Sequence, residues 1–177
     1  MGETILVLGG ARSGKSRLAE HLAGEREPVT LVATATLDPS DIEMSARIAR
    51  HRAERPARWT TEETSRDLEG VLHRLADREG AVIVDCVTLW ISNLMLGREG
   101  VEAWEDEAIL KAVDRAAVSA QGRARVIWVS NEVGSGIVPV NALARRFADL
   151  QGWANQRLAA ACDVVHLCVA GLSLRLK

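Results

Sequence analysis

The sequence predicts an α/β protein in which a mostly parallel sheet is covered by helices on both faces. Short apolar segments of strand length alternate with longer amphipathic segments, and nearly continuous apolar strands are typical of parallel sheets buried on both sides. The 177 residues show no internal repeat and no linker-like tract, so we expect one domain that spans residues 1–177.

The predicted elements alternate along the chain. Apolar runs place strands at 5–8, 29–33, 81–85, 126–130, 164–169 and 173–176. Amphipathic segments place helices at 15–23, 41–54, 62–77, 88–96, 101–121 and 141–161. Asp41 is a suitable cap for the second helix, and Pro56 favours its end. Because ligands bind beyond the carboxyl ends of parallel strands, the loops at 33–39, 85–88 and 131–139 are candidate binding loops.

A glycine-rich motif follows the first predicted strand and leads into the first predicted helix. Residues 9–16 fit the pattern G-x-x-x-x-G-K-[ST], which predicts a P-loop NTPase-type (RecA-like) domain. Its backbone N–H groups would cradle phosphates, a lysine would reach the β- and γ-phosphates, and a serine hydroxyl would bind Mg²⁺. The predicted nucleotide-binding residues are Gly9, Gly10, Ala11, Arg12, Ser13, Gly14, Lys15 and Ser16, with Lys15 also catalytic.

Asp85 ends the apolar segment Ala-Val-Ile-Val at 81–84. In P-loop proteins a carboxylate at such a strand end helps to hold Mg²⁺, directly or through water, so we predict that Asp85 and Ser16 form the metal site. Two alternatives remain open at this stage: a contact from Asp85 to the base or ribose, and a solvated residue or helix cap.

The predicted helix at 41–54 has one strongly basic face. Arg47, Arg50, His51 and Glu54 lie three or four residues apart and therefore share that face. Neighbouring arginines disfavour protonation of His51, which keeps a ring nitrogen available as a nucleophile, and they would also attract a triphosphate. An exposed basic helix with an ordinary surface histidine explains the same spacing.

Composition excludes several classes of function. The net charge of −2 argues against nucleic acid as a partner, and no apolar stretch is long enough for a membrane span. The chain opens directly into its first strand without a secretory signal, and its three cysteines (86, 162 and 168) lie in apolar surroundings. We therefore expect reduced core thiols, in preference to a disulfide or a metal site, and a cytoplasmic protein.

The segments that carry these features resemble one known family. They are GGARSGKS at 9–16, VATAT at 32–36, EMSARIARHRAERPARWTTEE at 43–63, VDCVTLWISNLM at 84–95, the long segment at 130–165 that begins SNEVGSGIVP, and AGLSLRLK at the C-terminus. Together they resemble the bifunctional adenosylcobinamide kinases/adenosylcobinamide-phosphate guanylyltransferases of cobalamin biosynthesis. The resemblance spans nearly the whole chain.

The resemblance implies two reactions. The first phosphorylates the aminopropanol hydroxyl of adenosylcobinamide with GTP or ATP. The second transfers GMP from GTP to adenosylcobinamide phosphate, and His51 matches the family's guanylyl-carrying histidine. The resemblance also implies a homotrimer, Mg²⁺ as cofactor, and nucleotide contacts beyond the P-loop from Ala33, Thr34, Ala35, Arg52, Ala53, Glu54, Arg55, Glu63 and Asp85.

Other features leave alternatives. The glycine-containing segment 131–139 is interpreted as a substrate loop, although it also fits a turn before the next helix. Arg145 and Arg146 fit either a subunit contact or solvent, and the five tryptophans are expected in the core or an interface, with Trp59 the best candidate to stack on a corrin ring. A plain P-loop kinase or a GTP-dependent switch would not need His51.

Overall fold

The computed structural model describes residues 2–35, 42, 46, 49, 56–97 and 100–177. The strands are β1 (Thr4–Gly9), β2 (Val29–Ala33), β3 (Thr60–Glu63), β4 (Ala81–Asp85), β5 (Arg125–Asn131), β6 (Val164–Val169) and β7 (Leu172–Arg175). The helices are α1 (Lys15–Gly24), α3 (Leu68–Leu75), α4 (Val87–Leu96), α5 (Asp106–Ser119) and α6 (Ala142–Ala161). The strands form one sheet in the order β3-β2-β4-β5-β1-β6-β7, parallel throughout except for β7.

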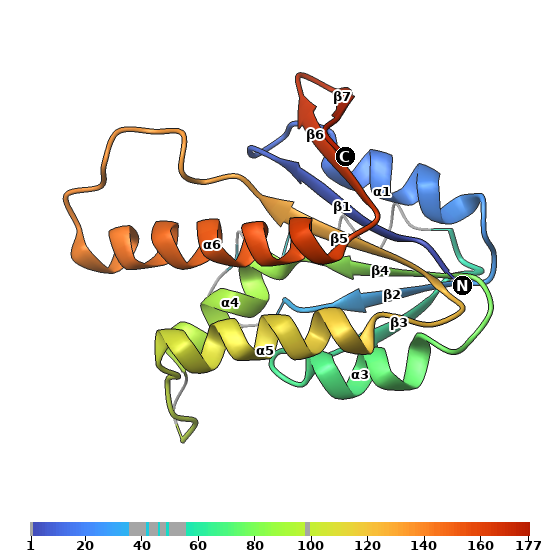
Figure 1. Cartoon of the computed structure of the whole chain (residues 1–177), viewed down its shortest axis with the longest axis horizontal. Helices are drawn as coiled ribbons and strands as arrows, with labels where there is room; N and C mark the ends of the chain where they lie inside the picture. Colours follow the sequence, from blue (N-terminus) through green and yellow to red (C-terminus); the bar gives the residue numbers. More distant parts are fainter. Residues whose placement is uncertain (1, 36–41, 43–45, 47–48, 50–55, 98–99) are drawn as a thin grey trace.

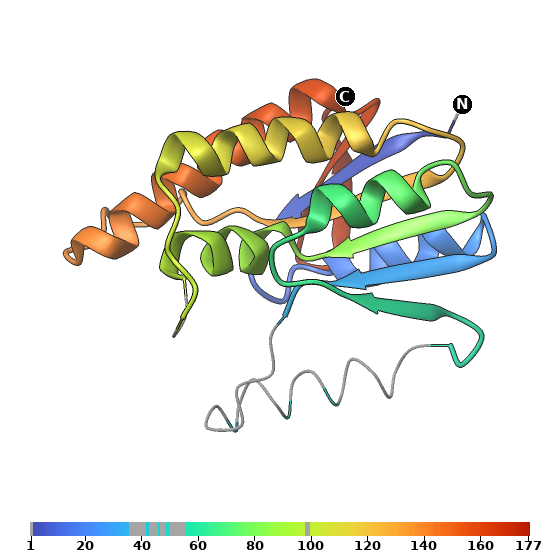
Figure 2. The ribbon, with the colours of Figure 1, turned by 90° about the horizontal axis from the view of Figure 1, so that it is seen from below.

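Helices cover both faces of this sheet (Figures 1 and 2). Residues of α1 pack with one set of strand side chains, which includes Ile5 and Val7. Residues of α3, α4, α5 and α6 pack with the other set, which includes Leu6. The alternation along β1 follows from the twofold periodicity of a strand, and because both faces are buried, nearly every position is apolar. The predicted fold class is confirmed.

The sequence-based prediction was wrong at the start of the third helix. Residues 62–77 were expected to be helical, but Thr60–Glu63 form strand β3 at the edge of the sheet, and the helix begins only at Leu68. The side chain of Asp67 caps this helix, since it accepts a hydrogen bond from the Gly70 N–H at 2.9 Å. The four residues of β3 are all polar, because an edge strand is partly open to water, and the sequence therefore lacks the apolar run that predicts a strand.

Other predicted boundaries differ by smaller amounts. The strands at 29–33, 81–85 and 164–169 are confirmed to the residue. The helix expected at 101–121 begins only at Asp106, because residues before it pair with other segments; the Trp104 N–H, for example, donates to the Leu94 carbonyl at 2.9 Å. The predicted helix at 41–54 lies largely outside the described residues.

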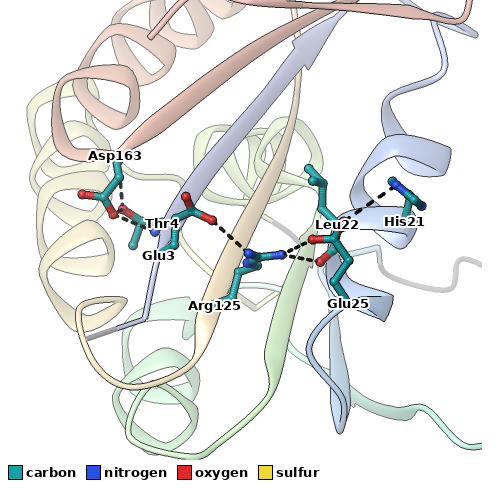
Figure 3. A network of polar contacts seen from close by, with 7 residues as sticks. All are labelled: Glu3, Thr4, His21, Leu22, Glu25, Arg125 and Asp163. Carbon is teal, nitrogen blue, oxygen red and sulfur yellow. Dashed lines mark hydrogen bonds and ion pairs between the residues drawn. The ribbon is translucent and has the colours of Figure 1, made fainter.

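The edge of the sheet at which the parallel strands begin is fastened by a polar network (Figure 3). The Arg125 guanidinium at the start of β5 donates to the Leu22 carbonyl at 2.9 Å and pairs with Glu25 at 2.7 Å and Glu3 at 3.1 Å. Beside it, Asp163 accepts from both the N–H and the hydroxyl of Thr4 at 2.8 Å. These contacts join β1 and β5 to the end of α1 and the segment before β6, so this edge has a structural role.

The remaining core predictions can be placed directly. Trp90 and Trp128 are buried in the core, as expected, whereas Trp153 is about half exposed. All three cysteines are free thiols, with Cys162 and Cys168 buried. No helix among the described residues is both long and apolar enough to cross a membrane.

Candidate nucleotide-binding site

The loop between β1 and α1 has the backbone shape of a phosphate-binding loop. Gly9 has φ +152° and Gly14 has φ +99°, conformations that L side chains rarely adopt. A Cβ on Gly9 would lie 2.4 Å from the Cys168 carbonyl oxygen, so the sequence needs glycine there. Gly14 stands at the N-cap of α1 and offers no side-chain cap, which leaves the first-turn N–H groups of the helix available to an anion.

Two polar side chains of this loop are buried. The Lys15 ammonium, in a residue only 8% exposed, donates to the Gly10 carbonyl at 2.6 Å and so lies over the loop. The Ser13 hydroxyl is buried and has no hydrogen-bond partner among the residues that the structure describes. Burying a polar group without a hydrogen-bond partner costs free energy. Within a phosphate-binding loop, such a hydroxyl is consistent with hydrogen bonding to a bound polar ligand.

A turn near the C-terminus supports the same loop, and sequence reasoning missed this contact. Ala170 (φ +52°) and Gly171 (φ +80°) form the two-residue turn between β6 and β7, with the left-handed backbone typical of tight hairpins. The Gly171 N–H donates to the Ser13 carbonyl at 2.9 Å, and Arg17 donates to the Gly171 carbonyl at 3.1 Å. The contact of this turn with the P-loop depends on tertiary structure, which the local sequence does not show.

Three predicted nucleotide contacts stand side by side at the carboxyl edge of the sheet. Ala33 at the end of β2 is in register with Glu63 at the end of β3 and with Asp85 at the end of β4. The structure thus brings together two carboxylates that are 22 positions apart in sequence, with one small residue between them. The acceptor oxygens of two neighbouring carboxylates suit the donor groups of a purine base or the coordination sphere of Mg²⁺.

Thr34 has a structural task that the sequence did not reveal. Its side chain is completely buried, and its hydroxyl donates to the Cys86 carbonyl at 2.7 Å and accepts from the Cys86 N–H at 2.9 Å. Its carbonyl accepts from the Asn93 side-chain amide at 2.8 Å. Thr34 therefore fixes the loop after β2 against the loop after Asp85, and its hydroxyl makes its hydrogen bonds to the Cys86 backbone.

Burial also keeps the neighbouring thiol neutral. Desolvation, together with the adjacent Asp85 carboxylate, raises the pKa of Cys86 to about 11. Burial likewise raises the pKa of Cys162 to about 12. The three cysteines are free, as the expectation of reduced thiols requires, and the raised pKa shows that Cys86 is not an activated nucleophile.

The end of β5 lies between Asp85 and the P-loop. In the sheet, β5 is hydrogen-bonded to β4 on one side and to β1 on the other, with Asp85 opposite Val129 and Gly9 opposite Asn131. The next residue, Glu132, donates its N–H to the Gly9 carbonyl at 3.0 Å. The segment 131–139 therefore begins at the mouth of the P-loop, and the connection to α6 then projects away from the sheet (Figure 1).

A buried polar cluster holds this strand end. The Ser130 hydroxyl donates to Asn155 at 2.6 Å, and the Gln151 amide donates to Ser130 at 2.8 Å and to Asn155 at 3.0 Å. Asn155 also donates to the Asn131 carbonyl at 3.1 Å. These hydrogen bonds from Gln151 and Asn155 fix α6 against the end of β5.

Ser16 and Asp85 are of the residue types that bind Mg²⁺ in P-loop sites. Ser16 is half-buried in the first turn of α1, and Asp85 ends β4. The described part of the chain holds no group of three or more His, Cys, Asp or Glu that would enclose a metal by itself. One hydroxyl, one carboxylate and the phosphates of a nucleotide form the usual Mg²⁺ environment, for which no all-protein cage is needed.

Some predicted site residues cannot be placed. His51, Arg52, Ala53, Glu54 and Arg55 lie outside the described residues. The pair after the segment 131–139 can be placed: Arg145 donates to the Pro139 carbonyl at 2.8 Å and Arg146 donates to Asp106 at 2.7 Å, so each has an intramolecular task.

The fold and this loop define a P-loop NTPase fold, and solved structures agree. The chain resembles the assembled ATPase EscN from the type III secretion system of enteropathogenic E. coli, with a TM-score of 0.58 and 10% identity over 96% of this chain and 43% of that one. It also resembles the RadB recombinase, with a TM-score of 0.52 and 18% identity over 94% of this chain and 74% of that one. At such low identity the likeness shows the fold alone.

The sequence comparisons are more specific. Residues 5–176 match the family described as cobinamide kinase / cobinamide phosphate guanyltransferase. The bifunctional adenosylcobalamin biosynthesis protein CobU of Salmonella typhimurium is 43% identical over 98% of this chain and 99% of its own length. The bifunctional protein CobP of Pseudomonas aeruginosa is 45% identical over 97% of this chain and 96% of its own length. The chain belongs to this family, and the resemblance noted from its motifs is confirmed.

Proposed function

We propose that this chain is a bifunctional enzyme of adenosylcobalamin biosynthesis. It phosphorylates the aminopropanol hydroxyl of adenosylcobinamide and then transfers GMP from GTP to adenosylcobinamide phosphate, releasing pyrophosphate. The observation that carries the proposal is the match to the kinase/guanyltransferase family over residues 5–176, joined to a P-loop of the required backbone shape.

The kinase step uses the P-loop. The first-turn N–H groups of α1 and the Lys15 ammonium bind the phosphates of GTP or ATP, and they offset the charge that develops on the transferred phosphoryl group. Ser16 and Asp85 are the residues that would hold Mg²⁺, Asp85 directly or through water. When bound, the ion neutralises charge on the phosphates.

The transfer step uses His51. Its imidazole attacks the α-phosphorus of GTP, so that an N–P bond forms and the bond to the pyrophosphate oxygen breaks. A phosphate oxygen of adenosylcobinamide phosphate then attacks the same phosphorus and displaces the imidazole. The segment Arg52, Ala53, Glu54 and Arg55 contributes to nucleotide binding in this proposal.

Selectivity for guanine is assigned to the carboxyl edge of the sheet. Glu63 and Asp85 flank Ala33. A carboxylate accepts hydrogen bonds from both the N1–H and the N2 amino group of guanine, which adenine lacks in this arrangement, so one of the two reads the base, and Asp85 would do so in place of binding Mg²⁺. The loop after β2 contributes the other predicted contacts in this region, Ala33, Thr34 and Ala35. Replacing Glu63 or Asp85 with Ala should relax the preference for GTP over ATP, whereas an unchanged ratio in both variants would remove this assignment.

Further properties belong to the same proposal. The chain is one domain, residues 1–177, it acts in the cytoplasm, and it forms a homotrimer. Its partners are adenosylcobinamide, adenosylcobinamide phosphate, GTP and ATP, without nucleic acid. Support comes from the family resemblance and from the near-neutral net charge of −2.

Labelled nucleotide provides the test. The protein is incubated with Mg²⁺ and GTP labelled at the α- or the γ-phosphate, denatured, and assayed for retained label, with His51→Ala and Lys15→Ala in parallel. We expect acid-labile, alkali-stable label from α-labelled GTP only, and none in His51→Ala. Phosphorylation of adenosylcobinamide is measured separately and should persist in His51→Ala but not in Lys15→Ala.

Each contrary outcome identifies another class of protein. Phosphorylation of adenosylcobinamide without any adduct would indicate a monofunctional P-loop kinase. GTP binding without adduct or phosphorylated product would indicate a nucleotide-dependent switch.

A further inference from the structure

Glu132 is a carboxylate at the mouth of the P-loop to which nothing above gives a chemical role. It is the first residue after β5, and its backbone N–H donates to the Gly9 carbonyl at 3.0 Å. Because β5 separates β4 from β1 in the sheet, Glu132 leaves the sheet between Asp85 and the phosphate loop. The residue is therefore a neighbour of the loop that would hold the phosphates of a nucleotide.

The Glu132 carboxylate is oriented by a contact within its own loop. Its Oε1 atom accepts from the Gly134 N–H at 2.8 Å, which fixes the side chain within its own loop. Among the residues that the structure describes, no lysine or arginine forms an ion pair with it. A carboxylate is a common general base for a hydroxyl proton, and this half-buried side chain is held in place by its contact with Gly134.

The backbone that carries Glu132 is fixed by residues from two helices. The Asn131 N–H donates to the Thr88 hydroxyl of α4 at 2.9 Å, and the Asn131 carbonyl accepts from Asn155 of α6 at 3.1 Å. Gln151 supports Asn155 from the same helix at 3.0 Å. These contacts hold the end of β5, directly before Glu132, and general bases need a position held to within a few tenths of an ångström.

We infer that Glu132 is the general base of the kinase step. Its carboxylate accepts the proton of the acceptor hydroxyl as that oxygen attacks the γ-phosphorus. The new O–P bond forms, the bond to the β-phosphate oxygen breaks, and the nucleoside diphosphate leaves with the electron pair. The transfer step needs no such base, because its nucleophiles are an imidazole and an already ionised phosphate. The inference rests on the proposed function and adds a residue to its first reaction.

Glu132→Gln separates the two reactions. Glutamine keeps the length of the side chain and the oxygen that accepts from Gly134, so it removes the basicity while leaving the loop contact in place. The matched control is Asp149→Asn, which removes an exposed carboxylate from α6. Initial rates are measured for phosphorylation of adenosylcobinamide by γ-labelled GTP, and self-labelling is measured with α-labelled GTP. Thermal melting reports folding.

The expected result is a selective loss of the kinase reaction. In Glu132→Gln, kcat for phosphorylation should fall about 10²- to 10⁴-fold, the usual contribution of a general base, while KM for the acceptor changes by less than about threefold. Self-labelling by α-labelled GTP should stay within about twofold of wild type. Asp149→Asn should match wild type in both assays.

Two results would overturn the inference. A fall in kinase kcat of less than about fivefold would show that Glu132 does not take the proton. A parallel loss of kinase activity and self-labelling would show that the residue supports the P-loop structure instead. If wild-type protein itself neither phosphorylates the acceptor nor labels itself, the proposed function fails first and the inference fails with it.

Discussion

The hydroxyl of Thr34 provides a sharp test of how the candidate site is held together. Thr34→Val replaces one buried oxygen by a methyl group of similar size. The Cys86 N–H then loses the acceptor that the structure shows, at 2.9 Å, while the Cys86 carbonyl loses one donor at 2.7 Å and keeps the Trp90 N–H at 3.2 Å. The two losses are therefore unequal.

The magnitude follows from this difference. A buried donor left without an acceptor costs about 1–3 kcal/mol, and the loss of one of two bonds to the carbonyl costs about 0.5–1.5 kcal/mol. We expect Thr34→Val to lower the free energy of unfolding by about 1.5–4.5 kcal/mol, measured by urea denaturation followed by circular dichroism.

The control, Thr30, lies on β2, the strand that ends just before Thr34. The Thr30 hydroxyl pairs with the Thr60 hydroxyl at 2.9 Å in an exposed position, where water can replace either partner. Thr30→Val should therefore change the free energy of unfolding by less than about 0.5 kcal/mol. Equal effects of the two substitutions would refute the argument that Thr34 fastens the loops after β2 and β4 to each other.

Three further predictions concern single groups. Gly9→Ala should destabilise the fold by about 1–3 kcal/mol in urea denaturation, because the new Cβ would lie 2.4 Å from a carbonyl oxygen of β6. A Cβ at Gly10 would meet no atom within 4 Å, so Gly10→Ala should cost less than about 1 kcal/mol. A larger loss of stability for Gly10→Ala than for Gly9→Ala would contradict the loop geometry. Iodoacetamide at pH 8 should modify Cys86 at least about 100-fold more slowly in the folded protein than in urea, since burial raises its pKa to about 11; rapid alkylation seen by mass spectrometry would contradict this. Hydrogen bonds from the Thr4 N–H and hydroxyl hold the pKa of Asp163 below its ordinary 3.8, so the stabilisation by Asp163 is present above pH 3.8 and is lost as the pH falls through the lower, folded-state pKa. Asp163→Asn should therefore weaken the acid-induced loss of stability in pH-dependent unfolding, and an unchanged acid-induced loss would contradict this prediction.

The parts that the sequence predicted correctly have local causes. The P-loop at 9–16 needs glycine, lysine and serine at fixed spacing, and this pattern can be recognised in the sequence without knowledge of the fold. The apolar strand at 81–85 and its terminal Asp85 were likewise confirmed as β4, because a strand buried on both faces shows itself in composition.

The parts that were missed depend on pairing between distant segments. Thr60–Glu63 became strand β3 only because Thr30 and its neighbours on β2 offered an unpaired edge, and the polar sequence carried no sign of that edge. The task of Thr34 was hidden for the same reason, since its partner Cys86 lies 52 positions away. The roles of His51 and of Glu63 stay predictions.

The strand order turns these local features into one site. If β1 lay next to β4, Asp85 would adjoin the phosphate loop directly, and no strand would end between them. The inserted β5 separates the two and places Glu132 in the gap, while its backbone bond to Gly9 fixes the loop from that side. On the other side Gly171 fixes the loop through the Ser13 carbonyl. The motif at 9–16 therefore receives its final shape from residues more than 100 positions away.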